Sequence, residues 1–212
     1  LIDGGLLDHH SDRLTELSVA RRDEDPARLE ANLAMLRRFD RERLSPDDRL
    51  THDVLEALLA LAPEYRAFEW RSAAALYPVN PMDGVQTATP QFIASQHVVR
   101  TERSARHYVA RLEALGRKID QAIDEMRRQA RAGVVPPPSI LSASLAQVEG
   151  FVRPAAAEHA LVTDFARALE RLADLSPEDR AGLVAQARDR MSRSVYPAYQ
   201  QLYSVPRAIG CD

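Results

Sequence analysis

The sequence predicts an all-α fold: a multi-helix bundle with long antiparallel helices and one long non-helical connection that contains proline and glycine. Three observations lead to this prediction. Alternating runs rich in valine, isoleucine, threonine and aromatic residues, which are typical of strands, do not occur. Apolar residues instead recur at intervals of three or four positions. The 13 prolines mostly stand where helices are expected to begin or end, and glycine is scarce at 8 residues.

Three short motifs mark expected helix starts. Ser45–Asp48 and Ser176–Asp179 each place a serine at the N-cap and a proline at the first helical position. The acids that follow favour the positive end of the helix dipole. Asp25 and Pro26 repeat this arrangement with an aspartate cap, which predicts a helix start at Pro26.

Apolar stripes follow these starts, and each expected helix has a charged opposite face. We therefore expect surface helices packed on a common core. The clearest stripe extends from about Thr101 to Ala132, where Gly133 is a candidate C-cap and three prolines prevent continuation. The last helix is expected from Ser176 to Leu202, with a kink or break near residues 193–194 caused by Pro197. The stripes after Pro26 and Pro46 consist of Leu29, Leu33, Leu36 and Phe39, and of Leu50, Val54, Leu55, Leu58, Leu59 and Leu61.

One stretch, Tyr77–Pro90, has three prolines, a glycine and no helical period. Long connections without secondary structure are uncommon in compact domains and are often functional when they are ordered. The sequence pattern therefore places a candidate site here. The alternative is that this stretch only crosses the end of a bundle.

Composition excludes several classes of protein. With 212 residues, 45% of them hydrophobic, and a net charge of −3, the chain is long and apolar enough to bury a core. Its charge balance argues against disorder and against a nucleic-acid-binding surface. The lone Cys211 excludes an internal disulfide and a thiolate zinc site. No run approaches the length of a membrane span. We expect a single helical domain over residues 1–212 of a soluble protein, either cytoplasmic or exported.

Catalytic motifs are missing from the sequence. A helical zinc hydrolase needs two histidines one turn apart with a glutamate between them, but Glu158 and His159 are followed by Val162 and Thr163 where a second ligand would stand. No nucleophile elbow or glycine-rich phosphate loop occurs. Paired acids lie at helix starts or on polar faces, where solubility and the helix dipole explain them. We therefore predict no catalytic residue and no metal ligand.

The histidines leave one weaker reading open. The cluster of acids and histidines at residues 8–12 is better explained as a solvated turn than as a metal site, because adjacent histidines point in different directions. His97 and His107 are ten residues apart, which is too far for chelation by neighbouring turns. A metal site in a helix bundle that combines these two histidines with nearby acids is the third hypothesis for function.

The order of several segments is similar to that of a known family. The sequence resembles the N-terminal half of the bacterial "domain of unknown function 885" family over roughly residues 28–202. The segments that carry the resemblance are Tyr77–Gln86, Thr89–Ile93 with His97, Ala105–Leu112, Ile119–Asp124, Gly133–Pro137 and Tyr196–Leu202.

The resemblance implies a function that the residues themselves do not show. Family members look like large helical zincin-type metallopeptidases or their relatives, with the zinc motif in the later half. This chain would then be an N-terminal fragment, inactive alone, whose zinc lies only in the missing downstream region. Its partners would be the remainder of its own chain and a peptide-like substrate, and it would form part of a substrate-cleft wall. The cleft-facing candidates are Tyr77, Asn80, Asp83, Gly84, Gln86 and His97.

The alternative hypothesis is a free-standing helical module that binds a protein or peptide and has no enzymatic activity. The two hypotheses differ in one surface property. An N-terminal portion of a longer protein should expose a contiguous apolar face meant for the rest of that protein. A stand-alone module should have polar residues there.

Overall fold

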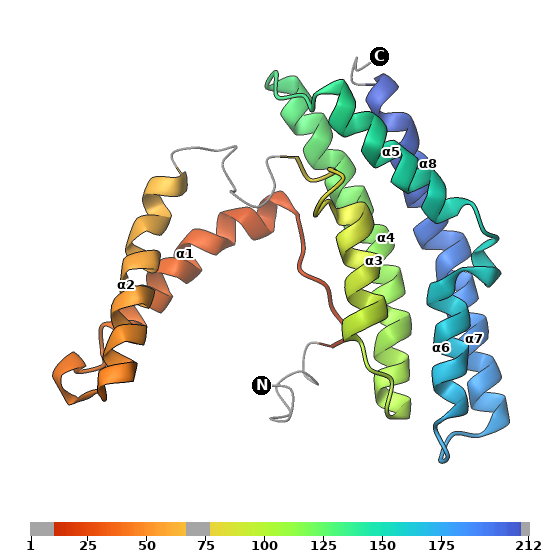
Figure 1. Cartoon of the computed structure of the whole chain (residues 1–212), viewed down its shortest axis with the longest axis horizontal. Coiled ribbons are helices and arrows are strands. Elements are labelled where there is room, and N and C mark those ends of the chain that lie inside the picture. The colour runs from red at the N-terminus through yellow and green to blue at the C-terminus, as the bar shows by residue number, and fades with distance from the viewer. Residues whose placement is uncertain (1–10, 67–76, 209–212) are drawn as a thin grey trace. The chain divides into compact units, whose positions relative to one another are not determined.

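The computed structural model describes residues 11–66 and 77–208, and the regular structure in them is helical, without a strand (Figure 1). The all-α prediction is therefore confirmed. The chain divides into two compact units, Leu17–Leu76 and the combination of Leu1–Glu16 with Tyr77–Asp212. The expectation of one domain over residues 1–212 stays a prediction.

The smaller unit contains α1 (Val19–Leu36) and α2 (Pro46–Arg66), which pack against each other. The start of α2 is as predicted, because the amide of Asp48 donates to the hydroxyl of Ser45 (3.2 Å). The predicted start of α1 at Pro26 is wrong, since the helix begins at Val19 and contains Pro26. Good helix formers in residues 19–25, including alanine and arginine, outweigh the hydrogen bond that proline cannot make.

The apolar stripes of the smaller unit are only partly covered. Leu29, Leu33 and Leu36 are half-buried, whereas Phe39 is 58% exposed and Leu50 is 66% exposed. Among the side chains described in this unit, only His52 is buried. The prediction that these stripes lie in a core is therefore wrong for the α2 stripe, because two helices alone cannot enclose it.

The larger unit is organised around α4 (Glu102–Arg131). This helix packs against α3 (Val85–Gln96), α7 (Pro177–Arg190) and α8 (Tyr196–Ala208) (Figure 1). The remaining helices are α5 (Pro138–Val152) and α6 (Ala160–Glu170). The predicted stripe of α4 forms the core of the unit and consists of Tyr108, Leu112, Leu115, Ile119, Ile123 and Met126, all buried.

The ends of α4 are as the sequence predicts. The amide of Ser104 donates to the hydroxyl of Thr101 (3.1 Å), which caps the first turn. At the other end, Gly133 has φ of 76° and its amide donates to the backbone oxygen of Ala130 (3.0 Å). Glycine adopts this left-handed conformation without strain, so it terminates the helix at low energetic cost.

A break interrupts the last predicted helix. Ser176 caps α7, and regular helix then gives way to a π-helical segment, Met191–Val195, before α8 begins at Tyr196. The predicted break near residues 193–194 is thus confirmed, because Pro197 has no amide hydrogen to donate into the preceding turn. Gly116 of α4 faces this segment, where a Cβ atom would lie 2.9 Å from the backbone carbon of Ser194.

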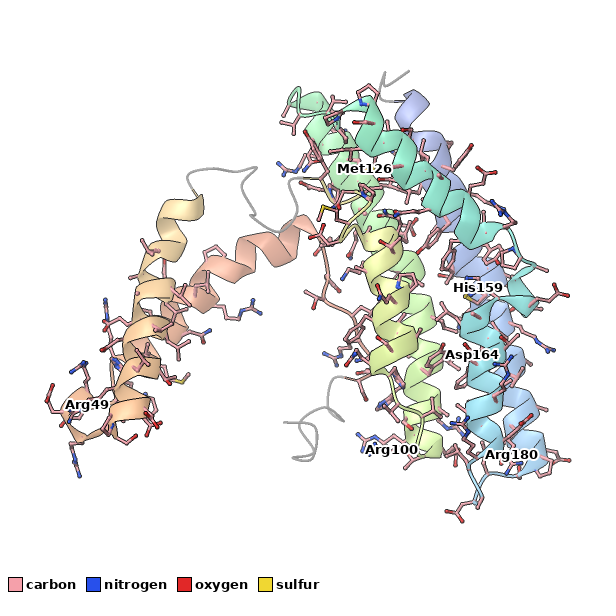
Figure 2. The ribbon with its side chains drawn as sticks, in the orientation of Figure 1. Arg49, Arg100, Met126, His159, Asp164 and Arg180 are labelled. Carbon is pink, nitrogen blue, oxygen red and sulfur yellow. The ribbon has the colours of Figure 1, made fainter. Side chains whose placement is uncertain are left out.

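His159 is the N-cap residue of α6 (Figure 2). Its side chain is buried, and its Nδ1 atom accepts a hydrogen bond from the amide of Leu161 (3.1 Å). The sequence predicts only a surface or partly packed histidine here. A histidine that accepts at Nδ1 is neutral, and its burial lowers its pKa.

The non-helical connection is shorter than predicted. It ends at Gly84, and residues 85–90 belong to α3 with Pro90 inside the helix. The amide that Pro90 lacks would have bonded to the backbone oxygen of Gln86. The hydroxyl of Tyr199 donates to that oxygen instead (2.7 Å), so the proline leaves no buried oxygen unsatisfied.

Candidate functional site

Asn80 organises the turn in the Tyr77–Gly84 connection. Its Oδ1 atom accepts hydrogen bonds from the amides of Met82 and Asp83, each 3.0 Å long. Its Nδ2 atom donates to the backbone oxygen of Tyr77 (3.1 Å). One asparagine side chain therefore fixes the turn on both sides, as is typical of an Asx turn.

Gln86 ties this turn to the helices behind it. Its side-chain amide donates to the backbone oxygen of Asn80 (2.7 Å) and to Oε1 of Gln147 in α5 (2.9 Å). Gln147 in turn donates to the backbone oxygen of Pro81 (2.9 Å). Together with the bond from Tyr199 of α8, these contacts attach the turn to two helices that are distant in sequence.

Gly84 allows the turn to close. Its amide donates to the backbone oxygen of Asn80 (3.2 Å), and a Cβ atom on Gly84 would overlap the backbone nitrogen and oxygen of Asn80. Only a residue without a side chain fits this close approach. The result is a rigid turn with a buried base and an exposed tip, where Asp83 is exposed and Met82 is 91% exposed.

His97 belongs to a second cluster, at the end of α3. It is buried, with its Nε2 atom 2.8 Å from the backbone oxygen of Ser104 and its ring perpendicular to that of Tyr108, the ring centres being 5.2 Å apart. The guanidinium of Arg111 lies 2.8 Å from its Nδ1 atom. Because Nδ1 accepts from Arg111, Nε2 carries the proton and donates to Ser104. Burial is the largest cause that lowers the pKa of His97, to about 4, so the ring is neutral at pH 7.

Arg111 connects this cluster to the start of the chain. Its Nε atom donates to the backbone oxygen of Arg13 (3.2 Å), and its guanidinium lies 5.2 Å from the ring centre of Phe92. Burial lowers the pKa of Arg111. Sequence reasoning missed this residue, although its position three residues after Tyr108 places it on the apolar face of α4.

The structure brings the six predicted candidates into two groups. Asn80, Gly84 and Gln86 hold the turn, while Asp83 lies on its exposed tip and Tyr77 supplies a backbone acceptor. His97 lies in the separate cluster with Arg111.

A family model described as "Bacterial protein of unknown function (DUF885)" matches residues 3–208. The chain belongs to this family. The resemblance seen in the order of its segments is therefore confirmed.

A solved structure shares the fold of this DUF885 chain. It comes from Colwellia psychrerythraea and is described as a "putative lipoprotein". The TM-score is 0.80 at 20% sequence identity, and the match covers 94% of this chain but 35% of that one. The likeness shows the fold alone. No curated protein matches the sequence.

The described residues of this DUF885 chain contain no group of three or more histidine, cysteine, aspartate or glutamate side chains that could hold a metal ion. Nδ1 of His97 is bonded to Arg111, and Nδ1 of His107 lies 2.5 Å from the hydroxyl of Ser11. These contacts leave the third hypothesis, a metal site at His97 and His107, without support. The acid and histidine cluster at residues 8–12 falls largely outside the described residues. No helix that the structure describes is long and apolar enough to cross a membrane.

We expect His97 to make the stability of this DUF885 chain depend on pH. In the unfolded chain the ring protonates near pH 6.5, whereas in the fold its pKa is about 4. The free energy of unfolding should therefore fall as pH drops from 6.5 to 4. We expect a loss on the order of 1 to 2 kcal/mol, allowing for solvent screening. Burial also lowers the pKa of His159, so its protonation should likewise lower the free energy of unfolding as pH drops.

Urea unfolding of the wild type and of His97→Gln at pH 7 and pH 4.5 isolates the part due to His97. Glutamine can donate to Ser104 and accept from Arg111 but does not titrate. The variant should therefore lose less stability between the two pH values. An equal loss in both proteins would show that His97 does not cause the pH dependence.

Proposed function

We propose that this DUF885 chain is the non-catalytic helical N-terminal portion of a longer metal-dependent peptidase or hydrolase. In this proposal it forms part of the wall of the substrate cleft. Any zinc would be bound by residues of the downstream portion, because the described residues of this chain offer no ligand cluster. The substrate would be peptide-like.

The observation that carries the proposal is the exposed face of α2. Leu50, Val54, Leu58 and Leu61 follow one another at intervals of four, four and three positions, so they lie on one face of the helix. Each is exposed, with exposed fractions between 41% and 66%. Contiguous exposed apolar faces in proteins usually mark an interaction surface.

The coverage of the related structure supports the choice of partner. This chain spans 35% of the length of the Colwellia psychrerythraea chain whose fold it shares. A longer protein would provide the partner for the α2 face. A stand-alone module should instead have polar residues at these positions, so the exposed leucines favour the first hypothesis over the second.

The Tyr77–Gly84 turn supports a role in a cleft wall. Its base is buried and bonded to α5 and α8, while Met82 and Asp83 project from its tip. A rigid turn can present side chains to a ligand without the entropic cost of ordering a loop. In this proposal Asp83 contacts the substrate, with Tyr77 beside it. Asn80, Gly84, Gln86 and His97 position the wall behind them.

A cysteine-labelling experiment tests the α2 interface. We expect Leu58→Cys, in a Cys211→Ser background, to react with a maleimide in the 212-residue chain. In the protein expressed from the whole natural reading frame, labelling should be at least tenfold slower, because the face is then covered. Val98→Cys is the matched control, because this exposed residue lies outside both α2 and the Tyr77–Gly84 turn, and it should react readily in both proteins.

Two results would contradict the proposed interface. Equal labelling of position 58 in the two proteins would show that nothing downstream covers the α2 face. Slow labelling already in the 212-residue chain would show that this face packs within the chain itself.

A further inference from the structure

A cavity of about 420 Å³ lies between residues 12–16 and one face of α4. Its volume is in the range of small-molecule sites. All of its lining residues belong to the larger unit. The α4 residues that line it lie on one face of the helix, because they are spaced three or four positions apart or adjoin residues that are. They are Ala110, Glu113, Ala114, Arg117, Lys118 and Gln121.

Lys118 is unusual in this sequence. Of the 28 lysines and arginines in the chain, it is the only lysine. Its ammonium group is a compact point charge, unlike the planar guanidinium of arginine. It is half-buried in the wall of the cavity. The only lysine of the chain therefore lies in the wall of a ligand-sized space.

The other charges around the cavity already have partners. Glu113 lies 3.2 Å from Arg117 and 3.4 Å from Arg190, and Asp12 lies 3.6 Å from Arg13. Glu16 also has an interaction partner. Within the part of the chain that the structure describes, no carboxylate lies within ion-pair distance of Lys118.

The protonation equilibrium of Lys118 agrees with this geometry. Burial lowers its pKa, and no neighbouring carboxylate acts in the opposite direction. A partly buried ammonium without a counter-ion carries an unfavourable desolvation cost. A negatively charged group placed beside it would offset that cost.

We propose that this cavity binds a small carboxylate ligand, with the carboxylate paired to the ammonium of Lys118. The methyl groups of Ala110 and Ala114 would contact the short carbon chain of the ligand. Lys118 is the cation of the cavity wall that has no carboxylate within ion-pair distance, so it is the partner for the carboxylate of the ligand. The ligand is either the C-terminal end of a short peptide or a free carboxylic acid. The inference does not depend on the proposed function, because every residue of the site lies in this chain.

Calorimetric titration of the 212-residue chain at pH 7 tests the inference. The probes are trialanine, trialanine with an amidated C-terminus, and propionate. We expect trialanine or propionate to bind, and the amidated peptide to bind at least tenfold more weakly than trialanine or not at all. Tighter binding of trialanine identifies a peptide end as the ligand, whereas equal or tighter binding of propionate identifies a free acid.

Two variants locate the binding. Lys118→Met should weaken the binding of the carboxylate probe at least tenfold. Arg106→Met removes one positive charge from an exposed part of α4, where Arg106 pairs with Glu102 outside the cavity. It should change the affinity less than twofold. Equal affinity of Lys118→Met and wild type, equal affinity for the amidated peptide, or no binding of any probe would overturn the inference.

A second measurement uses the wild type and does not depend on how the variant folds. Limited acetylation with an N-hydroxysuccinimide ester can modify the side-chain amine only at Lys118, because no other lysine exists. The bound carboxylate probe should slow acetylation of Lys118 several-fold, as measured by mass spectrometry, and leave acetylation of the N-terminal α-amino group unchanged. An unchanged rate at Lys118 under saturating probe would overturn the inference.

Discussion

Replacing Gly84 with alanine is expected to lower the free energy of unfolding of the larger unit by about 3 kcal/mol. The new Cβ atom would overlap backbone atoms of Asn80, which cannot move aside as a flexible side chain can. The amide of Gly84 would then lose its bond to Asn80, and the contacts from Gln86 to Asn80 and Gln147 would be strained. Urea denaturation followed by circular dichroism measures this loss.

Gly150→Ala is the matched control for this substitution. Gly150 lies in α5, and a Cβ atom there would have no heavy atom within 4 Å. Because alanine favours the helix over glycine, this variant should be more stable than wild type by roughly 0.5 to 1 kcal/mol. If Gly84→Ala were as stable as wild type, the turn would not be held as rigidly as its contacts indicate.

Much of the helical fold could be predicted because its signals are local. Serine caps followed by proline mark the starts of α2 and α7, and the apolar stripe of α4 marks its buried face. The predicted start of α1 and the predicted end of the non-helical connection are wrong for the same physical reason. Pro26 and Pro90 both lie inside helices, because a proline removes one hydrogen bond without excluding the helix when the flanking residues favour it.

Burial was harder to predict than helix positions. The stripes of α2 and α4 have similar spacing, yet the α4 stripe is buried and Leu50 and Leu58 of α2 are exposed. Spacing shows which face of a helix is apolar. It does not show which element covers that face, because the covering element is distant in sequence.

The sequence predicts the position of the candidate turn but not the residues of other helices that hold it, because those residues are also distant in sequence. The absence of helical spacing locates the turn at Asn80 and Gly84. Its anchors could not be inferred, because Gln147 and Tyr199 are 61 and 113 residues away from Gln86. Arg111 lies on a face whose apolar neighbours are visible in the sequence, but its bond to His97 depends on how α3 meets α4.

The second large effect concerns catalysis. Under the proposed function, in which the zinc ligands lie in the downstream portion, we expect the 212-residue chain to cleave no peptide, with or without added zinc. The protein from the whole natural reading frame should cleave peptides, and removal of zinc by a chelator should abolish the cleavage.

The variant Leu50→Ser/Leu58→Ser of this longer protein should cleave peptides more slowly, because the polar side chains would weaken the docking of the α2 face on the downstream portion. Val98→Ser, which alters an exposed apolar residue outside α2, should keep its activity.

The proposed function is tested most sharply by the rate of peptide cleavage by these two proteins, measured side by side with a mixture of internally quenched fluorogenic peptides. The proposed function predicts zinc-dependent cleavage by the longer protein and none by the 212-residue chain. Cleavage by the 212-residue chain itself would contradict it. A natural reading frame that encodes only this chain, with no zinc-binding partner encoded nearby, would contradict it as well.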